Sequence, residues 1–145
     1  MAYGVVAALG LATEKHKGQK YGERNYIPHV EEVMDEVLRL DLRKLGLARH
    51  TVATVAVLHD ILEDTDTTVA ELEKFGAEAV EAVLTITKQK GESRKDYLER
   101  VKNNKIAKVV KMADAVCNLR NSLLDNNAVR IARYADTISF LAKEK

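Results

Sequence analysis

The chain has 145 residues, enough for one domain with a substantial core and too few for two ordinary domains. Hydrophobic residues make up 46% of it and charged residues 31%, which excludes an intrinsically disordered chain. The net charge of +1 excludes a global field that would draw the protein onto nucleic acid or an anionic membrane, and the single cysteine, Cys117, excludes an internal disulfide. No apolar run approaches the ~18 residues of a membrane span. We therefore expect a cytoplasmic protein without a nucleic-acid or membrane partner.

Apolar residues recur along the chain at helical spacing, and only one Pro and seven Gly interrupt them. The first apolar stripe includes Val5, Ala8 and Ala12 and also carries His16, which we expect to be a core histidine. Nothing alternates with a period of two for long enough to predict a sheet. The predicted helices cover residues 2–18, about 28–40, 51–64, 68–76, 77–87, 93–101, 105–121 and 126–142. These patterns predict one all-α domain over residues 1–145, a compact bundle of about seven helices.

Four ionisable side chains follow the apolar run of residues 51–58, in the sequence His59-Asp60-Ile61-Leu62-Glu63-Asp64. If the helix continues, His59 and Glu63 share one face and Asp60 and Asp64 share another, because each pair is four residues apart. Burial of these charges without partners would be strongly unfavourable. Either a divalent metal with its bound water or a satisfied cluster of salt bridges at a helix end would compensate them.

His29 and Asp114 stand beside two other helix faces that have the pattern of buried faces. Together with His59 and Asp60, they offer two imidazoles and two carboxylates. Such a mixed set of nitrogen and oxygen ligands suits Mn²⁺, Fe²⁺ or Zn²⁺ better than Ca²⁺. A lone histidine such as His29 more often packs or caps a helix, so the metal hypothesis for it depends on the partners that His59 and Asp60 would provide.

Three motifs, in the same order along the chain, are similar to those of one known family. Residues 56–66 read AVLHDILEDTD, which resembles the family's HDxxED signature. Upstream, residues 16–19 and 26–29 read HKGQ and YIPH, and downstream, residues 110–120 read VKMADAVCNLR. The chain thereby resembles HD-domain phosphohydrolases of the RelA/SpoT hydrolase type, including the single-domain small alarmone hydrolases (MESH1-like). The resemblance implies an HD-domain bundle that hydrolyses guanosine 3′,5′-bis(diphosphate), ppGpp or pppGpp, at the 3′ position and releases pyrophosphate.

The resemblance also implies roles for individual residues. It implies one divalent metal ion, usually Mn²⁺, and four ligands for it: His29, His59, Asp60 and Asp114. It implies that Glu63 and Asp64 are the acidic pair that positions and deprotonates the attacking water, as general acid–base chemistry beside a metal requires. It further implies that Asn118 contacts the sugar or phosphate of the substrate near the metal.

The loop before His29 departs from the family pattern. Family members place an Arg-Lys pair there, against the base and phosphates of the nucleotide. Here residues 20–25 read KYGERN, about one residue shorter, with Asn25 where the family has Pro. Lys20 is the nearest counterpart, and Arg24 could substitute in space; each could bind phosphate or be a solvated loop charge. Two alternatives therefore stay open: a metal-dependent phosphatase or nucleotidase for another phosphorylated nucleotide, and a non-catalytic nucleotide-binding module.

Two further residues have less specific signals. Lys111 could neutralise phosphate charge or pair with Glu63, and for Tyr134 we expect packing in the core or on the surface. The pattern leaves the oligomeric state open.

Overall fold

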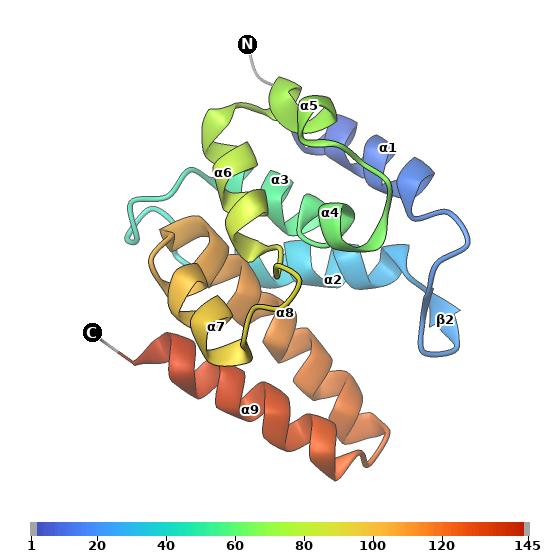
Figure 1. Cartoon of the computed structure of the whole chain (residues 1–145), viewed down its shortest axis with the longest axis vertical. Helices are drawn as coiled ribbons and strands as arrows, with labels where there is room; N and C mark the ends of the chain where they lie inside the picture. The colour runs from blue at the N-terminus through green and yellow to red at the C-terminus, as the bar shows by residue number, and fades with distance from the viewer. Residues whose placement is uncertain (1–2, 144–145) are drawn as a thin grey trace.

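The computed structural model describes residues 3–143, in which helices form almost all of the regular structure (Figure 1). The nine α-helices of these residues are α1 (Val5–Lys15), α2 (Ile27–Leu38), α3 (Arg49–Leu58), α4 (Ile61–Asp64), α5 (Val69–Leu72), α6 (Ala77–Ile86), α7 (Arg94–Lys102), α8 (Lys105–Leu124) and α9 (Ala128–Ala142). Seven of them have nine or more residues, which confirms the prediction of an all-α bundle. Within the described residues, no helix combines the length and apolar character that crossing a membrane needs.

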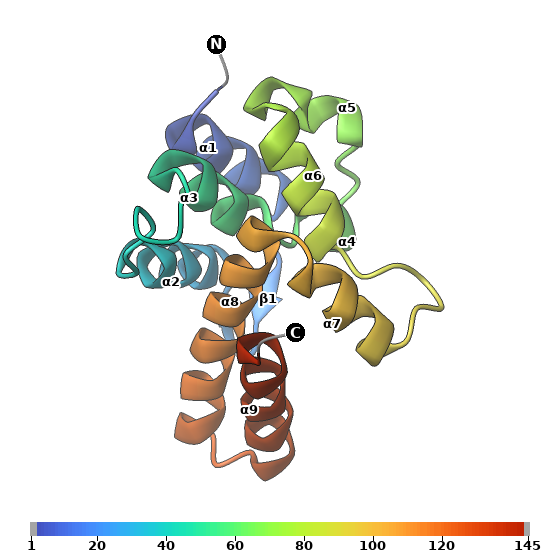
Figure 2. The ribbon, with the colours of Figure 1, turned by 90° about the vertical axis from the view of Figure 1, so that its left-hand side faces the viewer.

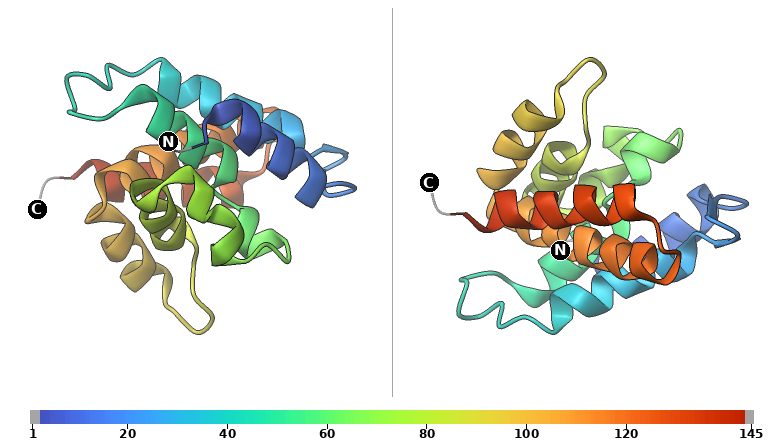
Figure 3. Two further views of the ribbon diagram at one scale, coloured as in Figure 1. Left: turned by 90° about the horizontal axis from the view of Figure 1, so that it is seen from above. Right: turned by 90° about the horizontal axis from the view of Figure 1, so that it is seen from below.

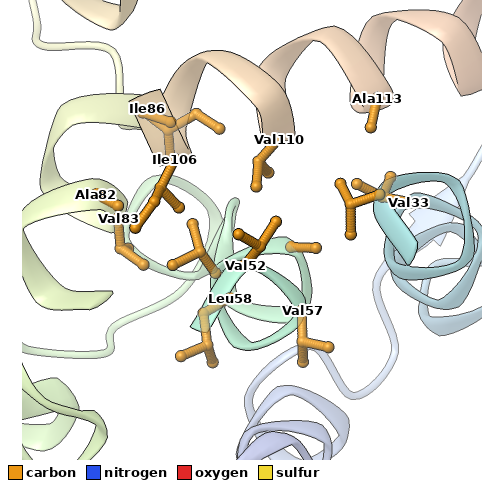
Figure 4. Packing of buried hydrophobic residues seen from close by; sticks show 14 of the residues in the cluster. Val33, Val52, Val57, Leu58, Ala82, Val83, Ile86, Ile106, Val110 and Ala113 are labelled. Carbon is orange, nitrogen blue, oxygen red and sulfur yellow. The ribbon is translucent and has the colours of Figure 1, made fainter. Parts of the chain in front are cut away.

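Helix α3 lies at the centre of the core. Every residue from Val52 to Leu58 is buried, because this segment is apolar or small on all sides and α1, α2, α6 and α8 pack around it. Figure 4 shows Val52 on the side of α3 that faces Val110 of α8, and Val57 on the side away from Val83 of α6. The buried segment Val52–Leu58 therefore fixes His59, which directly follows it, to the core.

Replacement of Leu58 by Ala should lower the free energy of unfolding by about 2–5 kcal/mol, because the lost methyl groups leave a cavity in a packed interior. Leu58 is fully buried, whereas Leu124 is 78% exposed and provides a matched control. Leu124→Ala should change the free energy of unfolding by less than about 0.5 kcal/mol. Urea unfolding of both variants measures the difference, and equal small losses would contradict the central position of α3.

Helices α8 and α9 form a helical hairpin that closes one side of the bundle (Figures 1 and 2). At 20 residues α8 is the longest helix, about 30 Å. The side chains of Asn104 and Asn127 cap the first turns of α8 and α9, respectively. Helix α9 also packs against α7, and Figure 3 shows from below how it crosses the bundle. The hairpin brings a face of α9 beside the middle of α8.

Two local predictions need correction, and the first concerns the segment from His59 to Asp64. It is not one continuous helix: α3 ends at Leu58 and α4 begins at Ile61, with Asp60 between them at φ −103° and ψ 1°. His59 and Glu63 therefore do not share one helix, whereas Asp60 and Asp64 still span one helical turn, because the N–H of Asp64 donates to the carbonyl of Asp60 at 2.9 Å. The Asp60 carboxylate accepts a hydrogen bond from the Tyr26 hydroxyl, a tertiary contact that sequence spacing does not reveal.

The second correction concerns the loop before α2, which contains a two-stranded hairpin. Strand β1 (Lys20–Tyr21) pairs antiparallel with β2 (Arg24–Asn25). Gly22 lies between them at φ +62°, the positive value that the first position of a tight hairpin turn needs and that glycine adopts without strain. Strands of two residues are too short to show an alternating pattern, which is why the sequence predicts only a loop.

Candidate metal centre and adjoining cavity

Three buried side chains from three helices converge at the centre of the molecule. His29 comes from the first turn of α2, His59 follows the last residue of α3, and Asp114 lies in the middle of α8. Each offers one ligand atom, and these atoms lie within 4.8 Å of one another. The Nε2 atom of His29 is 2.9 Å and that of His59 is 3.4 Å from Oδ1 of Asp114. The spacing is suited to one small cation.

Asp60 lies at the edge of this cluster, with its Oδ2 atom 3.2 Å from Nε2 of His59. The hydroxyl of Tyr26 donates a hydrogen bond of 2.7 Å to the same oxygen. The four residues predicted as metal ligands are thus brought together from segments separated by up to 85 residues. Tyr26 orients the Asp60 carboxylate from outside the cluster, as second-sphere partners of metal ligands commonly do.

The donor chemistry of the cluster fits a divalent metal. Nδ1 of His59 donates to the carbonyl oxygen of Ala56 at 2.7 Å, so in the neutral imidazole Nε2 carries the lone pair. That Nε2 atom is buried, makes no hydrogen bond, and faces two carboxylates. A buried lone pair opposite carboxylate oxygens is unfavourable unless a proton or a cation lies between them. Two imidazole nitrogens and two carboxylates are a suitable ligand set for such a cation.

The charges around the cluster are strongly coupled. Burial disfavours the protonated imidazole of His59, but Asp60 and Asp114 outweigh burial and raise the pKa of His59 well above its ordinary value. Burial likewise disfavours the ionised Asp114, but Lys111 and His59 hold its pKa well below the usual range. Lys111 lies 3.3 Å from Asp114, a pairing different from the predicted alternative with Glu63. The carboxylates are therefore ionised at neutral pH and attract a positive charge to the centre.

A cavity of about 430 Å³ opens next to the cluster, and positive side chains contribute much of its wall. Its lining includes three residues of the cluster, His29, Asp60 and Asp114, and four cationic side chains: Lys88, Arg94, Lys111 and Arg133. Tyr21, Tyr97 and Tyr134 add aromatic surface, and Asn118 adds an amide. Such a cavity suits a ligand that carries both an aromatic ring and several negative charges.

Arg94 is held in place by α9, which explains how this part of the wall forms. Its guanidinium donates to the Thr137 hydroxyl at 2.6 Å and to the Asp136 carboxylate at 2.9 Å. It also donates to the carbonyl oxygen of Arg133, one turn earlier on α9. The packing of α7 against α9 therefore places two arginines side by side in the cavity wall.

The predicted acidic pair divides between two environments. Glu63 lines the cavity, and its Oε1 accepts a hydrogen bond from the backbone N–H of Lys88 at 3.0 Å. Desolvation, together with the nearby negative charges of Asp60 and Asp64, raises the pKa of Glu63 above its ordinary value. Asp64 does not line the cavity; its Oδ2 accepts a hydrogen bond from the side-chain amide of Gln19 at 2.9 Å.

The three predicted substrate-binding residues also separate. Asn118 lines the cavity, donates to Asp114 at 3.2 Å, and accepts a hydrogen bond from the Tyr21 hydroxyl. Lys20 and Arg24 lie on the hairpin outside the lining. The ammonium of Lys20 donates to Asn25, and the guanidinium of Arg24 donates to Asn121 on α8. The first contact joins the two strands of the hairpin, and the second joins the hairpin to α8; the Tyr21 ring of the same hairpin stacks on His29, with their centres 4.3 Å apart.

Among the cavity residues that were absent from the predicted site are Lys88, Arg94, Tyr97 and Arg133. Lys88 and Arg94 belong to the basic segment of residues 88–94, whose composition is equally typical of a solvated loop, and Tyr97 and Arg133 have no distinct sequence signal. Tyr134, for which we expected packing, also lines the cavity. Arg94 and Tyr97 lie on α7 and Arg133 and Tyr134 on α9, so the contact between these helices, which no local motif encodes, brings them to one cavity.

Comparisons with known proteins agree with this geometry. An all-α bundle that assembles a His-Asp pair with a second histidine and a second aspartate defines the class of HD-domain proteins. The chain is 32% identical to guanosine-3′,5′-bis(diphosphate) 3′-pyrophosphohydrolase MESH1 of mouse over 123 residues, which are 81% of this chain and 68% of the relative. The human protein of the same name matches with the same identity and coverage. The chain therefore belongs to the MESH1 family.

A solved structure supports the fold independently. The structure of a metazoan ortholog of SpoT that hydrolyzes ppGpp matches with a TM-score of 0.72 and 24% identity, over 95% of this chain and 85% of that one. A longer relative, the guanosine-3′,5′-bis(diphosphate) 3′-pyrophosphohydrolase of Aquifex aeolicus, is 38% identical over 82 residues, 56% of this chain and 11% of that protein. No protein-family model matches the chain. The predicted HD-domain fold is confirmed.

Proposed function

We propose that this protein is a metal-dependent hydrolase that removes pyrophosphate from the 3′ position of ppGpp or pppGpp and leaves GDP or GTP. The observation that carries the proposal is the buried cluster of His29, His59 and Asp114 next to a cavity with cationic walls. The chain belongs to a family whose members are named for this reaction, and this supports the choice of substrate. The cavity offers aromatic surface for a base and positive charge for phosphates.

We propose that His29, His59, Asp60 and Asp114 hold one ion, and that this ion is Mn²⁺. The mixture of imidazole and carboxylate ligands supports this choice over Ca²⁺. When bound, a divalent metal lowers the pKa of water and polarises a phosphoryl oxygen. Ala56 and Tyr26 then orient the ligands, because one fixes the tautomer of His59 and the other holds the carboxylate of Asp60.

The residues around the four metal ligands carry out the remaining steps. Glu63, which lines the cavity, takes a proton from the attacking water, and Asp64 helps to position that water. The water oxygen bonds to the phosphorus that is linked to the 3′-oxygen, the bond between that phosphorus and the 3′-oxygen breaks, and the 3′-oxygen takes up the proton that Glu63 holds as pyrophosphate leaves. Arg94 and Lys111 balance the negative charge that gathers on the phosphoryl oxygens. Asn118 contacts the sugar or phosphate near the centre.

The predicted substrate-binding role of Lys20 and Arg24 depends on the part of the nucleotide that extends beyond the cavity. Both lie on the hairpin that brings Tyr21 to the site. We propose that the hairpin contributes mainly through Tyr21, whose hydroxyl donates to Asn118 of α8, with Lys20 and Arg24 available to an outer phosphate.

We further propose that residues 1–145 work as one domain, in the cytoplasm and on a small nucleotide, without a nucleic-acid partner. The balanced charge of the chain supports the last point.

The test is incubation of purified protein with Mn²⁺ and ppGpp, with nucleotide and pyrophosphate both quantified. We expect GDP and pyrophosphate in equal amounts. A folded, metal-loaded protein without turnover would overturn the proposal. A panel of other 3′- and 5′-phosphorylated nucleotides, scored for phosphate or pyrophosphate release, separates this reaction from that of another nucleotide phosphatase; binding without any turnover would indicate a non-catalytic module.

As the pH is lowered, activity should be lost at a pH above 4.5, which is the ordinary pKa of a glutamate side chain. Glu63 must be ionised to accept a proton, and its raised pKa keeps it protonated to a higher pH than an exposed glutamate. Activity is therefore present above that pKa and lost as the pH falls through it. The pH profile of kcat/KM measures the position of this limb. If Glu63→Gln retains activity with an unchanged acid limb, Glu63 is not the group responsible.

A further inference from the structure

The residues that follow α1 reach the acidic motif through two contacts: Gln19 donates to Asp64, and His16 packs against Tyr26, which donates to Asp60. His16 is buried and follows the last residue of α1, and its Nδ1 atom is 2.6 Å from Oε1 of Gln19. Nε2 of Gln19 is 2.9 Å from Oδ2 of Asp64. A continuous chain of polar contacts therefore runs from the core through Gln19 to Asp64.

The direction of these hydrogen bonds follows from the carboxylate at one end. An ionised Asp64 can only accept, so the NH₂ group of Gln19 must donate to it. This orientation turns Oε1 of Gln19 toward His16, where the oxygen must accept. His16 therefore carries its proton on Nδ1, and its buried Nε2 has no hydrogen-bond partner among the described residues.

His16 supports the second carboxylate through an aromatic contact. Its ring lies against that of Tyr26, with centres 4.4 Å apart, and the Tyr26 hydroxyl donates to Asp60 at 2.7 Å. The backbone joins the same residues: the N–H of Gln19 donates to the carbonyl of His16, and the N–H of Tyr26 donates to that of Gln19. One buried imidazole thus contacts the supports of both Asp60 and Asp64.

We propose that His16 and Gln19 are positioning residues that hold Asp64 in its working orientation, and that His16 also packs the tyrosine that orients Asp60. Neither residue lines the cavity, so both act through the carboxylates rather than on the nucleotide. This inference rests on the proposed hydrolase function, because it assigns Asp64 to the handling of water.

The test uses Gln19→Met, which keeps the length of the side chain and removes its donor. We expect kcat for ppGpp to fall about 10- to 100-fold, as misplacement of a reacting group does, with KM, metal content and thermal midpoint close to wild type. Lys17→Gln, an exposed change next to His16, is the matched control and should retain full activity. Wild-type kcat in Gln19→Met would overturn the proposal.

A second pair of variants separates positioning from packing. His16→Phe keeps a ring against Tyr26 but has no donor, whereas His16→Asn offers an amide N–H near the position of Nδ1. We expect His16→Asn to retain more of kcat than His16→Phe. The reverse order would show that only the ring matters, and it would overturn the proposed hydrogen-bond chain from His16 through Gln19 to Asp64, called the relay below.

An observation that needs no turnover distinguishes failure of the relay from failure of the function. Long-range ¹⁵N NMR of the wild-type imidazoles should show His16 protonated at Nδ1 and not at Nε2; the opposite tautomer would overturn the relay. Wild-type protein that binds metal and does not hydrolyse ppGpp refutes the function instead, whatever the tautomer.

Discussion

Asp114→Asn is expected to remove tight binding of the divalent metal and to lower turnover of ppGpp by about 10³-fold or more. Loss of metal activation removes several kcal/mol of transition-state stabilisation, and each ~1.4 kcal/mol corresponds to a tenfold change in rate. Asp114 has the largest effect because it is the carboxylate that both His29 and His59 face. Metal content of the purified variant and kcat measured over a range of Mn²⁺ concentrations provide the two readouts.

The control for this change lies at the end of the same helix. Asp125 is exposed and, among residues 3–143, forms an ion pair with Arg130 alone, so Asp125→Asn should bind metal and turn over substrate like wild type. Asp114 also pairs with Lys111, so the fold of the variant must be checked by circular dichroism. A folded Asp114→Asn protein with wild-type metal content would contradict its assignment as a ligand.

The double variant Glu63→Gln and Asp64→Asn is expected to abolish turnover while the metal stays bound. Both substitutions keep the shape of the side chains and remove their ability to take a proton, which is worth about 10²–10⁴ in rate. Among the single variants, Glu63→Gln should lose more than Asp64→Asn, because Glu63 lines the cavity and Asp64 is directed to Gln19. Single-turnover measurements with saturating Mn²⁺ give the rates.

Glu78→Gln, an exposed change in the first turn of α6, is the matched control for this double variant. It should leave both turnover and metal binding at wild-type levels. If the double variant retains the activity of the control, either the acidic pair has no part in the chemistry or the activity belongs to a contaminant; repurification of the variant to constant specific activity decides between these.

Much of the fold follows from local patterns. The capping box of Thr68 and Glu71 starts a short helix at the predicted place, and the caps Ser93 and Asn104 begin α7 and α8. The break at Asp60 and the hairpin around Gly22 were missed. Both are held by long-range contacts, to Tyr26 and to α8, respectively, and such contacts leave no periodic trace in the sequence.

The sequence by itself determined which side chains could bind a metal, because imidazole and carboxylate groups are nitrogen and oxygen donors in any fold. It also determined that these residues sit at the ends and on the faces of apolar helices. Only the tertiary structure decided which charges line the cavity: Arg94 and Arg133 do so, while Lys20 and Arg24 make hydrogen bonds on the hairpin and to α8. The reason is physical. A ligand type is a property of one residue, but the wall of a cavity depends on how α7, α8 and α9 pack against one another.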